Sequence, residues 1–235
     1  MTDRRTFCLA SGAALLGLYH GNTWADADAL QDTLRDIEAT ARGRLGVHIL
    51  DTGTGREHGW RSDERFLMLS SFKLLASALV LDRADRGEES LERRIRYRRQ
   101  DLVSSSPVTE RHVGGEGLSL AQLCEATLTT SDNTAANLIL ASYGGPAALT
   151  AYARRLGDRV TRLDRMEPEL NVRAAGGEPL DTTTPRAIEH TLRALLVGDA
   201  LSPASRARLL QWLLANTTGG YAPRLWTREK WPGAT

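Results

Sequence analysis

The sequence predicts an α+β protein, in which an all-helical domain is joined to a small antiparallel sheet flanked by helices. Three observations predict this class. A short apolar segment near the N-terminus is followed by a turn-rich stretch and a polar return segment. Most of the remaining chain carries helical periodicity, and one helix in its middle is apolar on nearly every side. The 235 residues, 41% hydrophobic and 25% charged, suffice for one or two packed domains.

The first 27 residues have the composition of an export signal. Arg4 and Arg5 precede a mostly apolar stretch over residues 7–19, and residues 25–27 offer the small side chains of a signal-peptidase site. The apolar stretch is too short to span a bilayer well. An arginine pair just ahead of an aromatic resembles a twin-arginine signal, while the basic region of an ordinary secretory signal fits the same residues. We therefore expect export to the periplasm or the medium, with no stable membrane insertion after cleavage.

Residues 28–62 are predicted to form the N-terminal part of the sheet domain. Apolar residues recur at helical spacing over residues 28–42, which predicts an amphipathic helix. The apolar residues 46–50 read as a strand, residues 51–55 are rich in turn formers, and a polar return strand follows near residues 56–61. This order is typical of a β-hairpin.

Residues 63–216 are predicted to form the helical domain. From residue 70 to about residue 86, apolar residues cover nearly the whole helix circumference, which is typical of a helix buried in a core. Further helices are predicted over residues 118–129, 134–142, 147–156, 185–196 and 203–216. Residues 157–181 contain several glycines and prolines and predict a long loop, of the kind that is commonly functional.

Charge and cysteine content exclude several classes of function. The net charge of +1 leaves no electrostatic footprint for nucleic acid, and the basic run over residues 93–99 follows three glutamates that partly neutralise it. Cys8 lies in the expected signal, so Cys124 alone remains after cleavage and no intramolecular disulfide can form. The cysteines and histidines lack zinc-site spacing, and neither HExxH nor GxSxG is present. We expect no metal ion, no cofactor and no nucleic-acid partner.

A serine and a lysine stand three residues apart at the start of the predicted buried helix. Ser70 and Lys73 should project from one helix face within reach of each other. A serine needs a neighbouring base to become a nucleophile, and a lysine in low-dielectric surroundings can lose its proton near neutral pH. A helix-capping serine with a lysine extending from the helix end is the structural alternative.

Two further motifs follow in order. Ser131-Asp132-Asn133 precedes a predicted helix, and helix capping alone could account for these three residues. Glu167 begins the pattern ExxLN, which ends at Asn171 inside the long loop; an acidic surface turn built on a proline is the alternative there. SxxK, SDN and ExxLN in this order resemble the signatures of the class A serine β-lactamases, which belong to the penicillin-recognising serine enzymes. Similar segments between the motifs extend the resemblance from about residue 46 to residue 219.

The resemblance implies a hydrolase that opens β-lactam antibiotics through an acyl-enzyme and so confers antibiotic resistance. Ser70 would attack the β-lactam carbonyl. Either Lys73, or Glu167 acting through a water, would remove the serine proton. Ser131 would relay a proton to the leaving nitrogen. The expected partner is a small-molecule β-lactam, and the expected state is a monomer.

The resemblance also assigns binding and deacylation. Asn133 would bind the substrate side-chain amide and help to position Lys73. Glu167 and Asn171 would hold the water that hydrolyses the ester. Arg165 and Asp181 match the charged pair that closes the neck of the loop in the family.

Several positions depart from the family. Ser105 stands where many members have an aromatic gate residue, which would leave one wall of the cleft more open. Ser77 stands where some relatives have the disulfide partner of the cysteine that matches Cys124. After Gly219 the family continues into strands that carry a Lys-Thr-Gly triad, and residues 217–235 look instead like a divergent tail. We therefore expect a truncated or frame-shifted chain without the family's C-terminal strands and last helix.

The expected loss of that strand bears on activity. It would remove a backbone donor of the oxyanion hole, and losing one such donor costs about 10²–10³ in turnover in a characterised protease. The chain as written is thus expected to be a poor or inactive β-lactamase. Two alternatives stay open: an inactive β-lactam-binding remnant, and a penicillin-binding transpeptidase or carboxypeptidase, against which the Glu167 loop argues. The nucleotide sequence after the Gly219 codon would test the frameshift.

Overall fold

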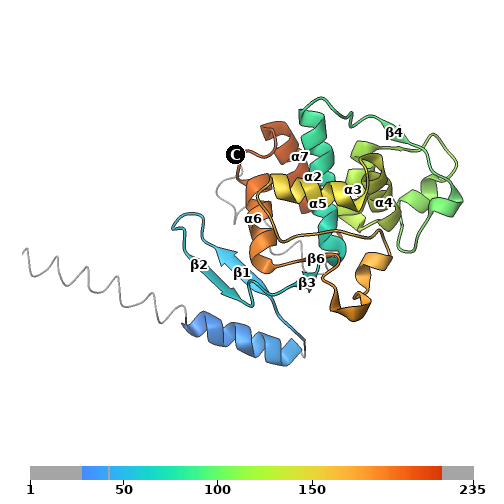
Figure 1. Ribbon diagram of the computed structural model, residues 1–235. Coiled ribbons are helices and arrows are strands. Elements are labelled where there is room, and N and C mark those ends of the chain that lie inside the picture. The colour runs from blue at the N-terminus through green and yellow to red at the C-terminus, as the bar shows by residue number, and fades with distance from the viewer. Residues whose placement is uncertain (1–27, 42, 219–235) are drawn as a thin grey trace, which may run out of the picture. The chain divides into compact units, whose positions relative to one another are not determined.

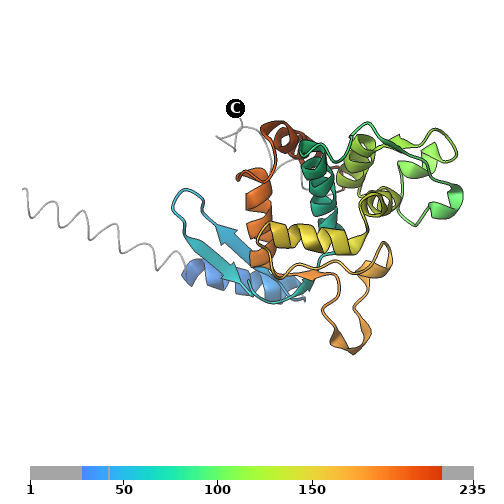
Figure 2. The same cartoon turned by 45° about the horizontal axis from the view of Figure 1, so that its top comes forward.

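The structure is a computed structural model that describes residues 28–41 and 43–218 (Figures 1 and 2). The expected signal peptide and the segment from Gly219 onward lie outside these residues. The chain divides into two compact units, with the division between Glu64 and Arg65. Within the described ranges, no helix combines the length and the apolar character that crossing a membrane requires.

The first unit contains the predicted helix and hairpin, and both are confirmed. The helix covers residues 28–41, and β1 (Val47–Leu50) pairs antiparallel with β2 (Glu57–Trp60). The Asp51 carboxylate accepts a hydrogen bond from the Gly53 N–H at 2.9 Å and so closes the turn on itself. Short polar side chains that bond to the backbone two residues on are the usual reason for a turn at such a sequence.

One partly buried carboxylate, that of Glu38, fastens the helix of this unit to its hairpin. Glu38 accepts hydrogen bonds from Nε of Arg61 at 2.9 Å, from the backbone N–H of Leu45 at 2.9 Å and from Nε1 of Trp60 at 3.1 Å. The Arg61 guanidinium above all, and then the Leu45 N–H, hold the pKa of Glu38 at about 2. Both donors favour the charged form of the carboxyl group, so it stays ionised at neutral pH.

The second unit is mainly helical. Its α-helices are α2 (Phe72–Asp85), α3 (Leu120–Thr130), α4 (Asn133–Ser142), α5 (Pro146–Arg155), α6 (Pro185–Leu196) and α7 (Pro203–Leu214). Its short 3₁₀ turns are η1 (Leu69–Ser71), η2 (Arg99–Asp101), η3 (Thr109–His112), η4 (Glu169–Asn171) and η5 (Ala175–Gly177). Two-residue strands form two antiparallel pairs: β3 (Phe66–Leu67) with β6 (Thr182–Thr183), and β4 (Arg94–Ile95) with β5 (Leu118–Ser119).

Helix α2 runs through the middle of this unit, as the prediction of a buried helix required (Figure 1). It packs against α3, α4, α5 and α7. Phe72, Leu75 and Leu81 point in different directions around the helix, and each is completely buried. A helix surrounded by other helices can be apolar on all sides, which accounts for its sequence. The SxxK motif therefore runs from the short turn η1, which contains Ser70, into the enclosed helix α2, which contains Lys73.

The helix starts follow from capping side chains. Ser119 accepts a hydrogen bond from the Gln122 N–H at 3.2 Å and caps α3. Thr184 and Ser202 cap α6 and α7, and each of these helices has a proline at its first position, as predicted. Proline is favoured there because the first N–H of a helix has no partner within the helix.

Several predicted helix limits were wrong by one or two residues, and two of them have a clear physical reason. Residues 118–119 belong to a strand, and α3 begins at Leu120. The reason is that the Ser119 cap holds an extended backbone conformation. At the other end of the fold, α7 stops at Leu214, and the Asn216 side chain instead donates a hydrogen bond of 2.7 Å to the carbonyl oxygen of Leu128.

Cys124 should be unreactive in the native protein. Its thiol is completely buried in α3, and burial raises its pKa to about 12, opposed only by the Ser77 hydroxyl. Because the thiolate is the reactive species, this shift alone should slow reaction with a disulfide reagent by about 10³. The measurement is the labelling rate with Ellman's reagent in a Cys8→Ser variant, native and in denaturant. Rapid native labelling would contradict the packing described here.

Candidate active site

The predicted nucleophile and lysine lie at the N-terminal end of α2. Ser70 belongs to η1, which leads directly into the helix, and Lys73 follows in the first turn. The Nζ of Lys73 is 3.2 Å from the Ser70 Oγ. Leu69 has a φ of 47°, in the left-handed region that side chains with a branched carbon skeleton seldom adopt. Such conformations are concentrated at functional sites.

Lys73 is the centre of the polar cluster, although only 2% of its surface is exposed. Its ammonium donates to the Ser131 carbonyl oxygen at 2.8 Å, to the Ser131 Oγ at 2.9 Å and to Oδ1 of Asn133 at 2.6 Å. Its Nζ also lies 3.3 Å from Oε1 of Glu167. Burial lowers the pKa of Lys73 below its ordinary value, while the carboxylates of Glu167 and Asp132 act in the opposite direction. Lys73 can therefore exchange a proton more readily than an exposed lysine.

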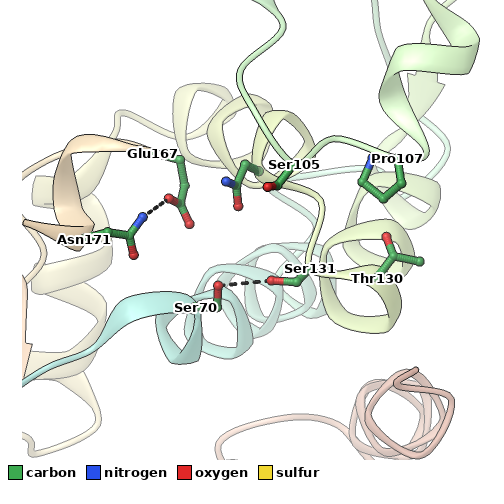
Figure 3. A pocket seen from close by; sticks show the side chains of 8 residues that line it. Ser70, Ser105, Pro107, Thr130, Ser131, Glu167 and Asn171 are labelled. Carbon is green, nitrogen blue, oxygen red and sulfur yellow. Dashed lines mark hydrogen bonds between the residues drawn. The ribbon is translucent and has the colours of Figure 1, made fainter. Parts of the chain in front are cut away.

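Ser131 occupies the junction between α3 and α4. Its φ of 58° and ψ of 34° place it in the left-handed region, where it ends α3 and turns the chain into α4. Its Oγ donates a hydrogen bond of 3.0 Å to the Ser70 Oγ (Figure 3). The two hydroxyls and the Lys73 amine thus form a closed triangle of hydrogen bonds, through which protons can pass in either direction.

Asp132 holds this junction in place from inside the protein. Its side chain is completely buried. It accepts hydrogen bonds from the backbone N–H groups of Val108 and Thr109, both at 2.9 Å, and from the Ala135 N–H at 2.8 Å. The Ala135 bond is the N-cap of α4, so one carboxylate fixes the helix start and the neighbouring loop together.

Glu167 comes from the predicted long loop and is 2% exposed. Its backbone N–H donates to Oδ1 of Asn137, and its carbonyl oxygen accepts from Nδ2 of the same residue, both at 2.9 Å. Its Oε2 accepts a hydrogen bond of 2.6 Å from Nδ2 of Asn171. Its Oε1 has no aligned hydrogen-bond donor among the described residues, although the ion-pair contact with Lys73 reaches it.

The neck of the loop is closed by the predicted charged pair. Nε of Arg165 lies 2.6 Å from Oδ2 of Asp181, and Oδ1 of Asp181 accepts the backbone N–H of Arg165 at 2.9 Å. The Arg165 guanidinium also donates to the Val172 carbonyl oxygen at 2.6 Å. Leu170 is completely buried and anchors the middle of the loop. A loop held at its neck and its middle can position Glu167 firmly.

Most of the predicted site residues line one cleft of about 490 Å³. In Figure 3, Glu167 and Asn171 lie on one side of the cleft, and Ser70 and Ser131 lie along its floor. Its lining residues are Ser70, Ser105, Pro107, Thr130, Ser131, Asn133, Glu167 and Asn171. The structure therefore brings together five of the six predicted site residues on one surface, and the sixth, Lys73, lies directly behind them.

Sequence reasoning missed some members of the site. Asn137 was not predicted as a site residue, yet its side chain binds both backbone groups of Glu167. Pro107 and Thr130 line the cleft without having been singled out. No local signal marks Asn137, because its partner is 30 residues away. In the described part of the chain, no three His, Cys, Asp or Glu side chains lie together so as to hold a metal ion.

Comparison with known proteins gives a consistent result. The model of the Beta-lactamase enzyme family matches residues 29–233. The chain is 44% identical to Beta-lactamase OXY-2 of Klebsiella oxytoca over 228 residues, covering 97% of this chain and 78% of that protein. It is 45% identical to Beta-lactamase L2 of Stenotrophomonas maltophilia, covering 98% of this chain and 80% of that protein.

A solved structure gives the same match in three dimensions. The ancestral class A β-lactamase GNCA superposes with a TM-score of 0.77 at 61% identity, covering 80% of this chain and 72% of that one. The mixed fold, with helices and small antiparallel sheets, is thus confirmed. The segment from Gly219 onward lies outside the described residues, so the expected divergence of residues 217–235 stays a prediction. By fold, by sequence and by family match, the chain belongs to the class A serine β-lactamases.

Proposed function

We propose that this chain hydrolyses β-lactam antibiotics through an acyl-enzyme formed on Ser70. The observation that carries the proposal is the closed hydrogen-bonded group of Ser70, Lys73 and Ser131, with the Glu167 carboxylate at its edge. A nucleophile, a base within hydrogen-bond reach and a second residue that orients the base are the parts that acyl transfer requires.

Acylation begins when the Ser70 Oγ attacks the β-lactam carbonyl carbon. The serine proton passes to Lys73, whose lowered pKa increases the fraction of free amine. As the C–N bond of the ring breaks, the Ser131 hydroxyl delivers a proton to the nitrogen and recovers one from Lys73, which lies 2.9 Å from it. Asn133 holds the lysine from the other side and lines the cleft, where its side chain can also meet the substrate.

Deacylation requires a water molecule and a base. Glu167 and Asn171 share a hydrogen bond of 2.6 Å and line the cleft beside Ser70. A water held between them would attack the ester carbonyl, with its proton passing to the Glu167 carboxylate. The second proton transfer, back to the Ser70 oxygen, releases the opened product and restores the enzyme.

The test of this proposal is intact-mass analysis after incubation with a penicillin, for the parent chain and for Ser70→Ala. We expect a covalent adduct, or turnover of the drug, in the parent and neither in the variant. A peptide map should place any trapped adduct on Ser70. Equal adduct formation in the two proteins would overturn the assignment.

The pH dependence of acylation should identify Lys73 as the base. The Glu167 carboxylate favours the ammonium form of Lys73, so Glu167→Gln should lower the pKa of the lysine further. Since the free amine is the active form, the acylation rate should rise with pH and reach its plateau at a lower pH in the variant. Single-turnover acylation by a chromogenic cephalosporin measures this. Loss of acylation at every pH would show instead that Glu167 is the acylation base.

The proposal also covers the oligomeric state, the location and the biological role of the protein. The relatives at 44% and 45% identity are named as β-lactamases, so the transpeptidase alternative is not favoured. We propose a monomeric, exported enzyme that confers resistance by destroying a β-lactam before it reaches its target. Gel filtration of the purified protein and fractionation of expressing cells test these two statements.

A further inference from the structure

A second cavity lies beside the nucleophile and differs from the first in character. It has a volume of about 300 Å³, at the lower end of the range of small-molecule pockets. Its apolar side chains come from four helices and are Leu74, Leu128, Ile188, Leu192 and Leu213. We name these five residues the leucine-rich groove. None of them belongs to the acylation or deacylation machinery.

Ser70 lines both cavities, as does Ser131. The first cavity also contains Glu167 and Asn171, while the second contains Lys73 and the leucine-rich groove. A carbonyl carbon bound to the Ser70 Oγ would therefore be close to both cavities, the first lined by Glu167 and Asn171 and the second lined mainly by the leucine-rich groove. This juxtaposition suits a substrate with an apolar acyl group and a separate polar leaving group.

We infer that the chain also cleaves carboxylic esters whose acyl group is a short unbranched alkyl chain, and that the leucine-rich groove binds this chain. The inference uses the nucleophile of the proposed function and rests on it to that extent. The alkyl chain would displace water from Leu192 and Leu213, which are only half-buried in the protein itself. Burial of apolar surface from both partners favours binding roughly in proportion to chain length.

The reaction follows the atoms already in place. The Ser70 Oγ attacks the ester carbonyl carbon, and its proton passes to Lys73. The C–O bond of the ester then breaks, and the alcohol or phenol leaves through the first cavity with the proton that Lys73 accepted, relayed by the Ser131 hydroxyl, while the acyl chain remains in the groove. Departure of the alcohol or phenol leaves room for a water molecule on the side of the ester where Glu167 lies. Water activated there cleaves the acyl-serine ester and releases the free fatty acid.

The test uses p-nitrophenyl acetate, butyrate and hexanoate with the full chain and with Ser70→Ala, whose rate gives the background. Each methylene buried is expected to raise the Ser70-dependent kcat/KM by about fourfold. Leu192→Asn, which has nearly the same shape but is polar, should flatten this dependence on chain length. Leu192→Met serves as the matched apolar control and should keep it.

Acylation by a penicillin, measured by intact mass on the same samples, separates the two proposals. A penicillin adduct on Ser70 together with a flat chain-length series would overturn the ester inference and leave the proposed function standing. Absence of any adduct or ester turnover above Ser70→Ala would overturn both. Steep chain-length dependence in the parent and in Leu192→Met, lost in Leu192→Asn while its penicillin acylation persists, supports the groove as the acyl site.

Discussion

Glu167→Ala is expected to accumulate the acyl-enzyme, so that the variant binds the β-lactam covalently and releases it very slowly. The variant keeps Ser70 and Lys73 and should still acylate, but the group proposed to activate the hydrolytic water is gone. General-base catalysis contributes about 10²–10⁴ in rate, so deacylation and steady-state turnover should fall by that factor. Stopped-flow absorbance with a chromogenic cephalosporin should show a burst equal to the enzyme concentration, followed by a very slow phase.

The matched control for this experiment is Asn171→Asp, which keeps a side chain of the same shape. It replaces the donor of the 2.6 Å bond to Oε2 of Glu167 with an acceptor and leaves the carboxylate itself in place. A smaller loss of deacylation than in Glu167→Ala is expected, because the base remains but its orientation is less well fixed. Unchanged turnover in Glu167→Ala would show that another group activates the water.

Asp132→Ala is expected to cause the largest loss of stability in the site. The substitution leaves three backbone N–H groups without their acceptor: those of Thr109 and Ala135, which are buried, and that of Val108, which is partly buried. An unsatisfied buried donor costs about 1–3 kcal/mol. Together the three should lower the free energy of unfolding by at least about 3 kcal/mol, a large share of the 5–15 kcal/mol typical of a folded protein. Urea unfolding followed by circular dichroism gives this value.

Asp132→Asn provides the comparison, since one oxygen can still accept two of these N–H groups. Its destabilisation should be clearly smaller than that of Asp132→Ala. Both variants should also lose acylation rate, because Ser131 and Asn133 are the neighbours of the altered residue on each side. If Asp132→Ala lowers the free energy of unfolding by less than about 1 kcal/mol, water must replace the carboxylate as acceptor, and the junction between α3 and α4 must be accessible to water.

The sequence was sufficient for the parts of the molecule that repeat a pattern or carry a motif. The apolar circumference over residues 70 to about 86 identified the central helix, which the structure has at Phe72–Asp85, and Pro185 and Pro203 marked the first positions of α6 and α7. The six site residues were predicted from three short motifs, and the structure gathers them around one cleft. Their chemical roles follow from the resemblance and stay predictions until the variants are measured.

What the sequence could not show depends on contacts between distant segments. Strands β3 and β6 have two residues each, too few for an alternating pattern, and pair across more than a hundred residues. The Asn137 contacts to Glu167 and the leucine-rich groove arise in the same way, from side chains that the fold alone brings together. In the sequence alone, nothing distinguishes Leu192 or Leu213 from any other apolar residue on a helix face.

The two contacts that α4 makes, through Asn133 to Lys73 and through Asn137 to Glu167, fix the length of the chain between these two asparagines. They stand four residues apart, so they project from one face of the helix. Insertion or deletion of a single residue between them would rotate one asparagine by about 100° relative to the other. One of the two contacts would then be lost. Point substitutions in this turn can be tolerated during evolution, but changes in its length cannot, so alignments of active homologues should contain no gap there.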